Sequence, residues 1–161
     1  MKKAKHMQKQ YDLTAEIYDA RYSEVQREKY EQALAGIELR GRILDLGSGT
    51  GLLREFLKID VIGADISMNM LVKGAGGRVQ AEAEKLPFKS NSFDYVLSFS
   101  TLQNIENPEV TLKEAKRVLA KDGIFICTYL KSFKFDKIIS KHFKILKKRN
   151  CGEDTCLVLK S

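Results

Sequence analysis

Two aspartates and the glycines between them are the residues of this sequence best suited to binding a nucleoside. Asp45 lies in the apolar run 43–46, and Asp65 follows the apolar run 61–64, 20 residues after Asp45. Glycine occupies every second position of the loop that follows the first run, at Gly47, Gly49 and Gly51. Glycines let a backbone turn sharply and approach a ligand, and a carboxylate at this distance is typical of one that binds ribose hydroxyls. The pattern predicts a nucleoside cofactor.

The spacing of these glycines disfavours one class of cofactor. The loop reads Gly-x-Gly-x-Gly, whereas dinucleotide-binding proteins carry Gly-x-Gly-x-x-Gly and seat a pyrophosphate on the following helix. Asp45 would repel a phosphate, but it suits a cation such as an amino group. A nicotinamide-dependent dehydrogenase is therefore a distant alternative.

Most of the chain resembles one enzyme family. The runs ILDLGSGTGLL and VIGADIS are similar to motif I and the second-strand motif of class I S-adenosylmethionine-dependent methyltransferases, in the branch of small methyltransferase domains of type 11. The stretches 81–98 and 107–128 resemble the region of the family's third to fifth strands, and 11–30 resembles its lead-in helix. The resemblance covers about residues 10–130 and implies S-adenosylmethionine as cofactor, with S-adenosylhomocysteine as product.

The resemblance assigns roles around this cofactor. The loop residues Gly47, Ser48, Gly49 and Gly51 would pass beneath it. Asp45 would face its methionine end, through the amino group or a bound water, and Asp65 would accept hydrogen bonds from both ribose hydroxyls. The alternative for Asp65 is a cap for the next helix. Ile66 would pack on the adenine, and Met68 would pack either there or in the core.

The adenine amino group would be recognised further along the chain. Glu82 or the backbone of Ala83 occupies the place where relatives carry an acid next to adenine. The family's glycine and aspartate are replaced here by Ala81 and Glu82, so a solvated glutamate is the alternative.

Polar residues at the end of the expected strand 93–99 are the candidates for the transfer itself. Ser98 and Ser100 would line the sulfonium end of the cofactor, and Gln103 and Asn104 would point toward the acceptor. We therefore expect Ser100, Gln103 and Asn104 to be the catalytic residues. Tyr11 and Tyr18 could fold an aromatic face over the sulfonium, with core packing as the alternative.

Strands and helices alternate along the chain, which predicts a mostly parallel sheet covered on both faces. Strands are expected at 42–46, 60–64, 78–81, 93–99 and 123–130. Helices are expected near 51–58, 67–73, 108–120 and 133–142. The segments 143–148 and 155–159 predict a terminal antiparallel hairpin. The resemblance implies an α/β three-layer sandwich around a seven-stranded sheet, the class I methyltransferase fold.

The 161 residues are expected to form one domain. Residues 1–10 would be a basic flexible N-terminus, 11–36 a lead-in helix and 37–161 the Rossmann-like catalytic core. No apolar run approaches the length of a membrane span, and the three cysteines lack paired metal spacing. We expect a cytoplasmic protein without a metal site.

Basic charge gathers near the end of the sequence. Residues 131–150 contain seven lysines and one arginine against one acid. Such a segment attracts nucleic acid, anionic membranes or acidic proteins, although a lysine-rich helix and edge strand in solvent is an equal alternative. No long segment follows the expected fifth strand, where many relatives carry a substrate lid.

The sequence thus leaves three functions open. The first is a methyltransferase for a macromolecule, either RNA or an RNA-associated protein, bound through 131–150. The second is a methyltransferase for a small molecule or a lipid quinone. The third is a cofactor-binding subunit that is active only with a partner such as a small activator protein, so that the chain would be a monomer or half of a heterodimer.

Overall fold

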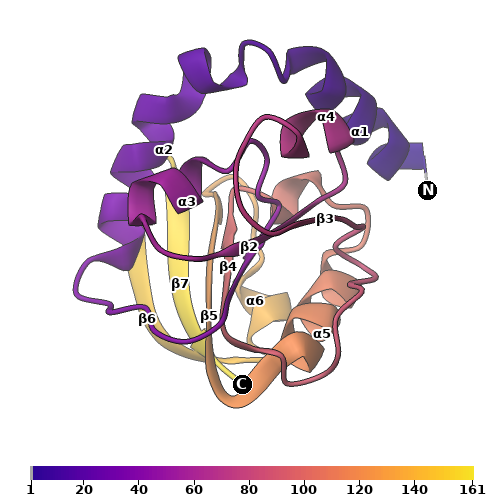
Figure 1. The fold of residues 1–161 in the computed structure, drawn as a ribbon. Coiled ribbons are helices and arrows are strands. Elements are labelled where there is room, and N and C mark those ends of the chain that lie inside the picture. Colours follow the sequence, from indigo (N-terminus) through magenta and orange to yellow (C-terminus); the bar gives the residue numbers. More distant parts are fainter. Residues whose placement is uncertain (1) are drawn as a thin grey trace.

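A mixed sheet of seven strands forms the centre of the folded molecule (Figure 1). The computed structural model describes residues 2–161. The strands are β1 (Ile43–Leu46), β2 (Ile62–Asp65), β3 (Arg78–Gln80), β4 (Phe93–Phe99), β5 (Leu119–Leu130), β6 (Lys144–Cys151) and β7 (Asp154–Lys160). Their order in the sheet is β3-β2-β1-β4-β5-β7-β6. Among the described strands, β7 runs opposite to the other six and pairs antiparallel with β5 and β6, so the predicted terminal hairpin is confirmed.

Helices cover both faces of the sheet. On one face lie α2 (Tyr18–Leu34) and α3 (Leu52–Leu57), which bury Tyr30, Ala33 and Leu53 against the strands. On the other lie α5 (Pro108–Val118) and α6 (Asp136–Ile139), which bury Leu112, Ala115 and Ile139. The two apolar cores on opposite faces confirm the predicted three-layer sandwich.

Parallel pairing brings the ends of three strands to one edge. All four residues of β1 are buried, as expected of a strand covered on both faces. Asp45 is in register with Gly63 of β2 and with Leu97 of β4. The loops that follow β1, β2 and β4 therefore meet at the carboxyl edge of the sheet, where ligands bind in open α/β folds.

Some element boundaries differ from those predicted. The strand predicted at 123–130 already begins at Leu119, because Leu119 pairs with Phe93 before the register shifts to the pair Tyr95–Ile124. The helices predicted at 67–73 and 133–142 shrink to the single turns α4 (Met68–Leu71) and α6. A short 3₁₀ helix, η1 (Leu102–Asn104), was not predicted.

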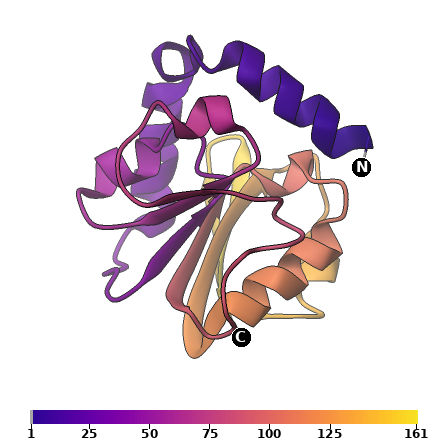
Figure 2. The same cartoon turned by 45° about the vertical axis from the view of Figure 1, so that its right-hand side comes forward.

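The N-terminal part forms two helices, where the sequence predicts one lead-in helix over 11–36. Residues 2–10 belong to α1 (Lys2–Thr14), which is rich in good helix formers, and α2 begins only at Tyr18. Thr14 is the last residue of α1, and its Oγ1 donates to the Gln10 carbonyl at 3.0 Å, a type of contact that slightly destabilises helices and often bends them. Figure 2 shows that α1 crosses above the carboxyl edge instead of packing on a sheet face.

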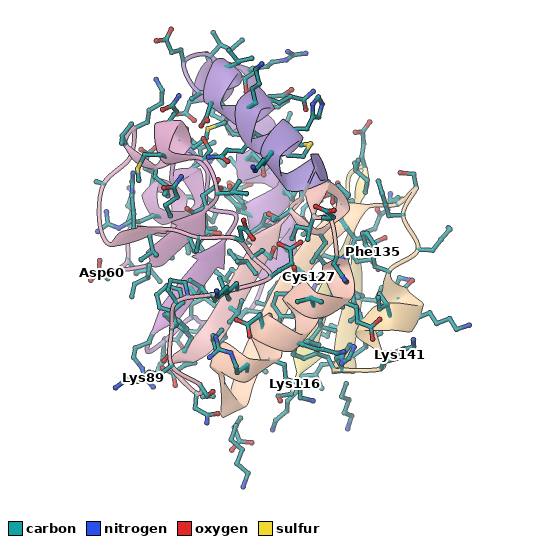
Figure 3. The ribbon with its side chains drawn as sticks, turned by 90° about the vertical axis from the view of Figure 1, so that its right-hand side faces the viewer. Asp60, Lys89, Lys116, Cys127, Phe135 and Lys141 are labelled. Carbon is teal, nitrogen blue, oxygen red and sulfur yellow. The ribbon has the colours of Figure 1, made fainter. Side chains whose placement is uncertain are left out.

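The described residues contain neither a membrane-spanning helix nor a disulfide bond. No helix among them is both long enough and apolar enough to span a membrane. All three cysteines are buried and unpaired. In Figure 3, Cys127 lies inside the protein behind α5, whereas Lys116 and Lys141 reach its surface.

Candidate functional site

The glycines after β1 give the loop a shape that larger residues would spoil. Gly47 has φ 80°, and a Cβ added there would stand 2.3 Å from Thr101 Oγ1. Gly49 has φ 52°, and an added Cβ would meet nothing within 4 Å. The loop therefore packs tightly on the β4 side and faces open space at Gly49.

Asp65 joins this loop to the loop after β2. Its Oδ2 accepts a hydrogen bond from the Gly49 backbone N–H, and its Oδ1 accepts one from the Ser67 backbone N–H, both at 2.8 Å. Burial raises the pKa of Asp65, and these backbone hydrogen bonds partly oppose the shift. Ser67 itself caps α4, since its Oγ accepts from the Met70 N–H at 3.2 Å. Asp65 thus orders both loops, and each carboxylate oxygen keeps a second lone pair for a ligand.

A hollow of about 110 Å³ lies between these loops and α1. The predicted residues that line it are Tyr18, Gly47, Gly49, Asp65, Ile66, Ala83, Ser100 and Asn104. It has a carboxylate at one wall and apolar side chains at another, which suits the ribose and base of a nucleoside.

Asp45 borders a second hollow, of about 30 Å³, next to the first. Tyr18, Gly47 and Gly49 line both hollows, and Gln26 of α2 borders the second. Asp45 is 4% exposed, and burial, followed by the charge of Asp65, raises its pKa to about 8. A buried acid with so high a pKa favours a cationic partner, which would lower the cost of its ionised form.

An open groove of about 900 Å³ runs between α2 and the β6–β7 turn. Exposed apolar side chains form part of its wall: Leu13, Ile17, Tyr22 and Val25. Gln103 lies in this groove alone. The residues that line both the groove and the 110 Å³ hollow are Met7, Tyr11, Tyr18, Ser100 and Asn104. The groove and the hollow are therefore separated by a wall of only a few side chains.

α1 and α2 are tied to the loops beneath them by polar contacts. The Asn104 side-chain amide donates to the Tyr11 hydroxyl at 2.7 Å. Ser67 donates to Asp12, and Thr50 donates to Asp19. Burial, with smaller contributions from the nearby Tyr18 and Asp65, raises the pKa of Tyr11, so its hydroxyl stays protonated.

Comparison with known proteins identifies the family. The methyltransferase-domain family matches residues 44–127, and an uncharacterized protein of Methanocaldococcus jannaschii is 37% identical over 142 residues, 83% of this chain and 55% of the relative. This chain belongs to the S-adenosylmethionine-dependent methyltransferase family. A ubiquinone/menaquinone biosynthesis C-methyltransferase of Ectopseudomonas mendocina is 35% identical over 130 residues, 70% of this chain and 50% of the relative. The chain spans about half the length of the curated relatives it matches.

Solved structures share the fold. A SAM-dependent methyltransferase of Thermotoga maritima superposes with a TM-score of 0.76 at 22% identity, over 93% of this chain and 97% of the other. A chain of the complex between the Haloferax volcanii Trm112 methyltransferase activator and a methyltransferase superposes with a TM-score of 0.74 at 14% identity, over 93% and 96%. The class I methyltransferase fold is thus shared with distant sequences.

The methyltransferase family's cofactor, S-adenosylmethionine, fits the residues present. The Asp65 carboxylate suits ribose hydroxyls, and the open space at Gly49 lets a ligand approach the loop backbone. Asp45, beside the second hollow, suits a cationic amino group. Ile66 and Ala83 supply apolar surface for a base.

Besides Asp45, five predicted cofactor residues lie outside the 110 Å³ hollow. Ser48 borders the hollow of Asp45, and Gly51 faces Arg78 on the far side of the loop. Ser98 is wholly buried inside β4, in register with Cys127 of β5. Glu82 is exposed, and Met68 is 46% exposed on the outer side of its turn.

Neighbours of two of these residues line the hollow in their place. They are Met70 and Glu84, each two positions further along the chain. Met68 and Met70 lie on different sides of the single turn α4, and Glu82 and Glu84 lie in the irregular segment after β3. A motif therefore locates the segment but not the side chain that faces the ligand.

The raised pKa of Asp45 predicts a pH-dependent stability. The folded chain holds a proton on Asp45 up to about pH 8, whereas the unfolded chain loses it near the ordinary pKa of an aspartate, 3.8. The native state thus binds more protons between these values, and stability should fall as pH rises, by at most about 1.4 kcal/mol per pH unit. Urea unfolding at pH 5 and pH 8 measures this loss. Asp45→Asn should remove it, and an equal loss in the variant would contradict the assignment.

Proposed function

We propose that this chain is an S-adenosylmethionine-dependent methyltransferase whose acceptor is a small molecule with an apolar body. The observation that carries the proposal is the wall of side chains shared by the 110 Å³ hollow and the open groove of about 900 Å³. A groove of about 900 Å³ with apolar sides has the size and lining of a small-molecule site. An acceptor bound there would lie beside the reactive end of the cofactor.

This function requires positioning more than acid–base chemistry. The cofactor supplies a methyl group on a sulfonium that is already a good leaving group, so the chain must mainly hold the acceptor in line. In our proposal the rings of Tyr11 and Tyr18 face the sulfonium, and Ser100, Gln103 and Asn104 orient the acceptor. The matched quinone C-methyltransferases, named for an apolar acceptor, support the same class of acceptor.

Three unpaired cysteines are typical of a reducing compartment, so we place the activity in the cytoplasm.

The first test is cofactor binding followed by methyl transfer. Calorimetry of the purified chain with S-adenosylhomocysteine should give saturable binding. Labelled S-adenosylmethionine and a cell extract should then place the label in the organic-solvent fraction rather than in RNA or protein. A folded chain that binds no cofactor would contradict the methyltransferase, and label found mainly in a macromolecular fraction would contradict the small acceptor.

A macromolecular acceptor is the second candidate, and the basic segment favours it. All seven lysines of 131–150 are exposed. Lys144 and Lys147 lie on the edge strand β6, and Lys148 forms an ion pair with Asp136 at 2.9 Å. None of these lysines lines the groove in the described part of the chain, and Figure 3 shows Lys141 well away from α1. Lysines also keep edge strands from pairing with other chains, which explains them without RNA.

Charge reversal on β6 separates the two candidates. We expect Lys144→Glu with Lys147→Glu to leave transfer to a small acceptor within about twofold, because exposed substitutions away from a site have small effects. A macromolecular acceptor bound through β6 would instead lose most of its methylation, and RNA affinity would fall with a weaker salt dependence. Labelled-methyl counts in the organic and RNA fractions, compared between the variant and the unmodified chain, decide the matter.

A small activator protein remains a proposed partner. The superposition with a chain of the Trm112 complex supports it, at a sequence identity that indicates the fold alone. If the chain is half of a heterodimer, the purified protein should bind cofactor weakly and gain affinity on co-expression with the partner. If it is a monomer, cofactor affinity should not depend on a second chain.

A further inference from the structure

A buried ion pair lies in the open groove between α2 and the β6–β7 turn, and it belongs to neither the glycine loop nor the Asp65 site. Lys29 of α2 and Asp154 of β7 approach to 2.9 Å between Nζ and Oδ2, with side chains that are 11% and 1% exposed. Both residues line the groove. Such a pair is costly to desolvate, and replacing it with apolar residues would often be neutral or stabilising, so stability is a weak reason for its presence.

Ser100 connects this pair to the wall shared with the cofactor hollow. Its Oγ donates to Asp154 Oδ2 at 2.7 Å and accepts a hydrogen bond from Lys29. Ser100 has φ 53°, a left-handed conformation that non-glycine residues rarely adopt, and its N–H bonds to Thr128 Oγ1 at 3.0 Å. Strain of this kind is kept where the surrounding structure requires it, often at functional sites.

The charges of the pair cancel, so the pair offers a donor and an acceptor side by side without net charge. Lys29 directs two of its three N–H donors at Asp154 and Ser100, which leaves one. Lys29 and Ser100 occupy both lone pairs of Asp154 Oδ2, so Oδ1 is the oxygen of this carboxylate left to accept. A hydroxyl group is the complement of this arrangement, because it accepts one hydrogen bond and donates another. An ether can only accept, and a carboxylate would add an unbalanced charge next to Asp154.

We propose that Lys29 and Asp154 bind the hydroxyl group of a phenol-like acceptor whose apolar body lies along Leu13, Ile17 and Val25. The Lys29 ammonium donates to the hydroxyl oxygen, and the hydroxyl proton is donated to Asp154. When the acceptor reacts, its O–H bond breaks, the electron pair stays on the oxygen beside Lys29, and the proton passes to the Asp154 carboxylate. This inference rests on the proposed function and names the acceptor class of that same groove.

Two probes that differ only in the hydroxyl group test the inference. Calorimetry would measure 4-hexylphenol and its methyl ether, 4-hexylanisole, against the chain saturated with S-adenosylhomocysteine. We expect the phenol to bind roughly tenfold more tightly, the value of about one hydrogen bond to a charged group. Equal affinities, or no binding of either probe to a cofactor-loaded chain, would overturn the inference. Failure of S-adenosylhomocysteine itself to bind would instead count against the proposed function.

Variants of the pair distinguish binding from a structural tie between α2 and β7. Lys29→Met and Asp154→Asn should bring the phenol-to-ether ratio close to one, whereas Arg27→Met, which breaks the exposed pair with Glu31 on the same helix, should keep it. A merely structural pair would lower the melting temperature of the variants and leave the ratio unchanged, which would overturn the inference. The probe comparison on the unmodified chain stands even if either variant fails to fold.

Discussion

Asp65→Asn should reduce the affinity for S-adenosylhomocysteine by about 100-fold or more. The carboxylate is expected to accept two ribose hydroxyls, and hydrogen bonds to a charged group contribute about 1.5–3 kcal/mol each. The amide also places N–H donors opposite the backbone N–H of Gly49 or Ser67, so one of the two loops loses its anchor. Because burial raises the pKa of Asp65, removing its charge does not by itself destabilise the fold. Calorimetry gives the affinity, and circular dichroism checks the fold.

Asp60→Asn is the matched control for this variant. Asp60 lies just before β2, its side chain is 96% exposed, and it contacts only Arg54, at 3.1 Å, among the ion pairs of the described residues. The control should bind cofactor within about twofold of the unmodified chain. An Asp65→Asn chain with nearly unchanged affinity would show that Asp65 orders its loops without touching the ribose.

Gly47→Ala should both destabilise the chain and weaken cofactor binding. The new Cβ meets Thr101 Oγ1 at 2.3 Å and Cγ2 at 2.5 Å, on a backbone with φ 80°. Thr101 has little room to move, because its Oγ1 bonds to the carbonyls of Leu46 and Phe99. Left-handed strain and overpacking together should cost about 2–5 kcal/mol, measured as a lower midpoint of urea unfolding. The displaced loop should also lower the affinity for S-adenosylhomocysteine.

Two further variants separate the clash from the backbone strain. Gly36→Ala has φ 70° with nothing within 4 Å of the new Cβ, so it should show the strain alone, about 1 kcal/mol. Adding Thr101→Ala to Gly47→Ala should recover part of the loss, since the two atoms nearest the new Cβ are removed. A double variant no more stable than Gly47→Ala would locate the damage elsewhere.

The fold was predictable because its signals are local. The consecutive apolar run at β1 and the alternation of strands and helices predict a parallel sheet, and the terminal hairpin follows from its two strand patterns. The N-terminal helices were harder. The stretch has the composition of one continuous helix, and neither glycine nor proline marks the turn between Thr14 and Tyr18.

The site was predictable as segments rather than as side chains. Asp65 and Gly49 meet as the motif requires, because the loops after β1 and β2 share one sheet edge. Ser98 is buried, as are both of its neighbours in the chain, because β4 is covered on both faces of the sheet, and spacing within a motif does not reveal this. The pair of Lys29 with Asp154 joins residues 125 positions apart in the sequence, and no local pattern indicates such a contact.

The wall that the groove and the hollow share has a thermodynamic consequence; it is formed by Met7, Tyr11, Tyr18, Ser100 and Asn104. Side chains that touch both ligands must suit both at once, so occupation of the hollow alters the free energy of filling the groove. By linkage, if bound cofactor changes the affinity for the acceptor by some factor, bound acceptor changes the affinity for the cofactor by the same factor. Acceptors measured against the empty chain would therefore be ranked differently from acceptors measured against the loaded one, and the methylated product would change how tightly the spent cofactor is held.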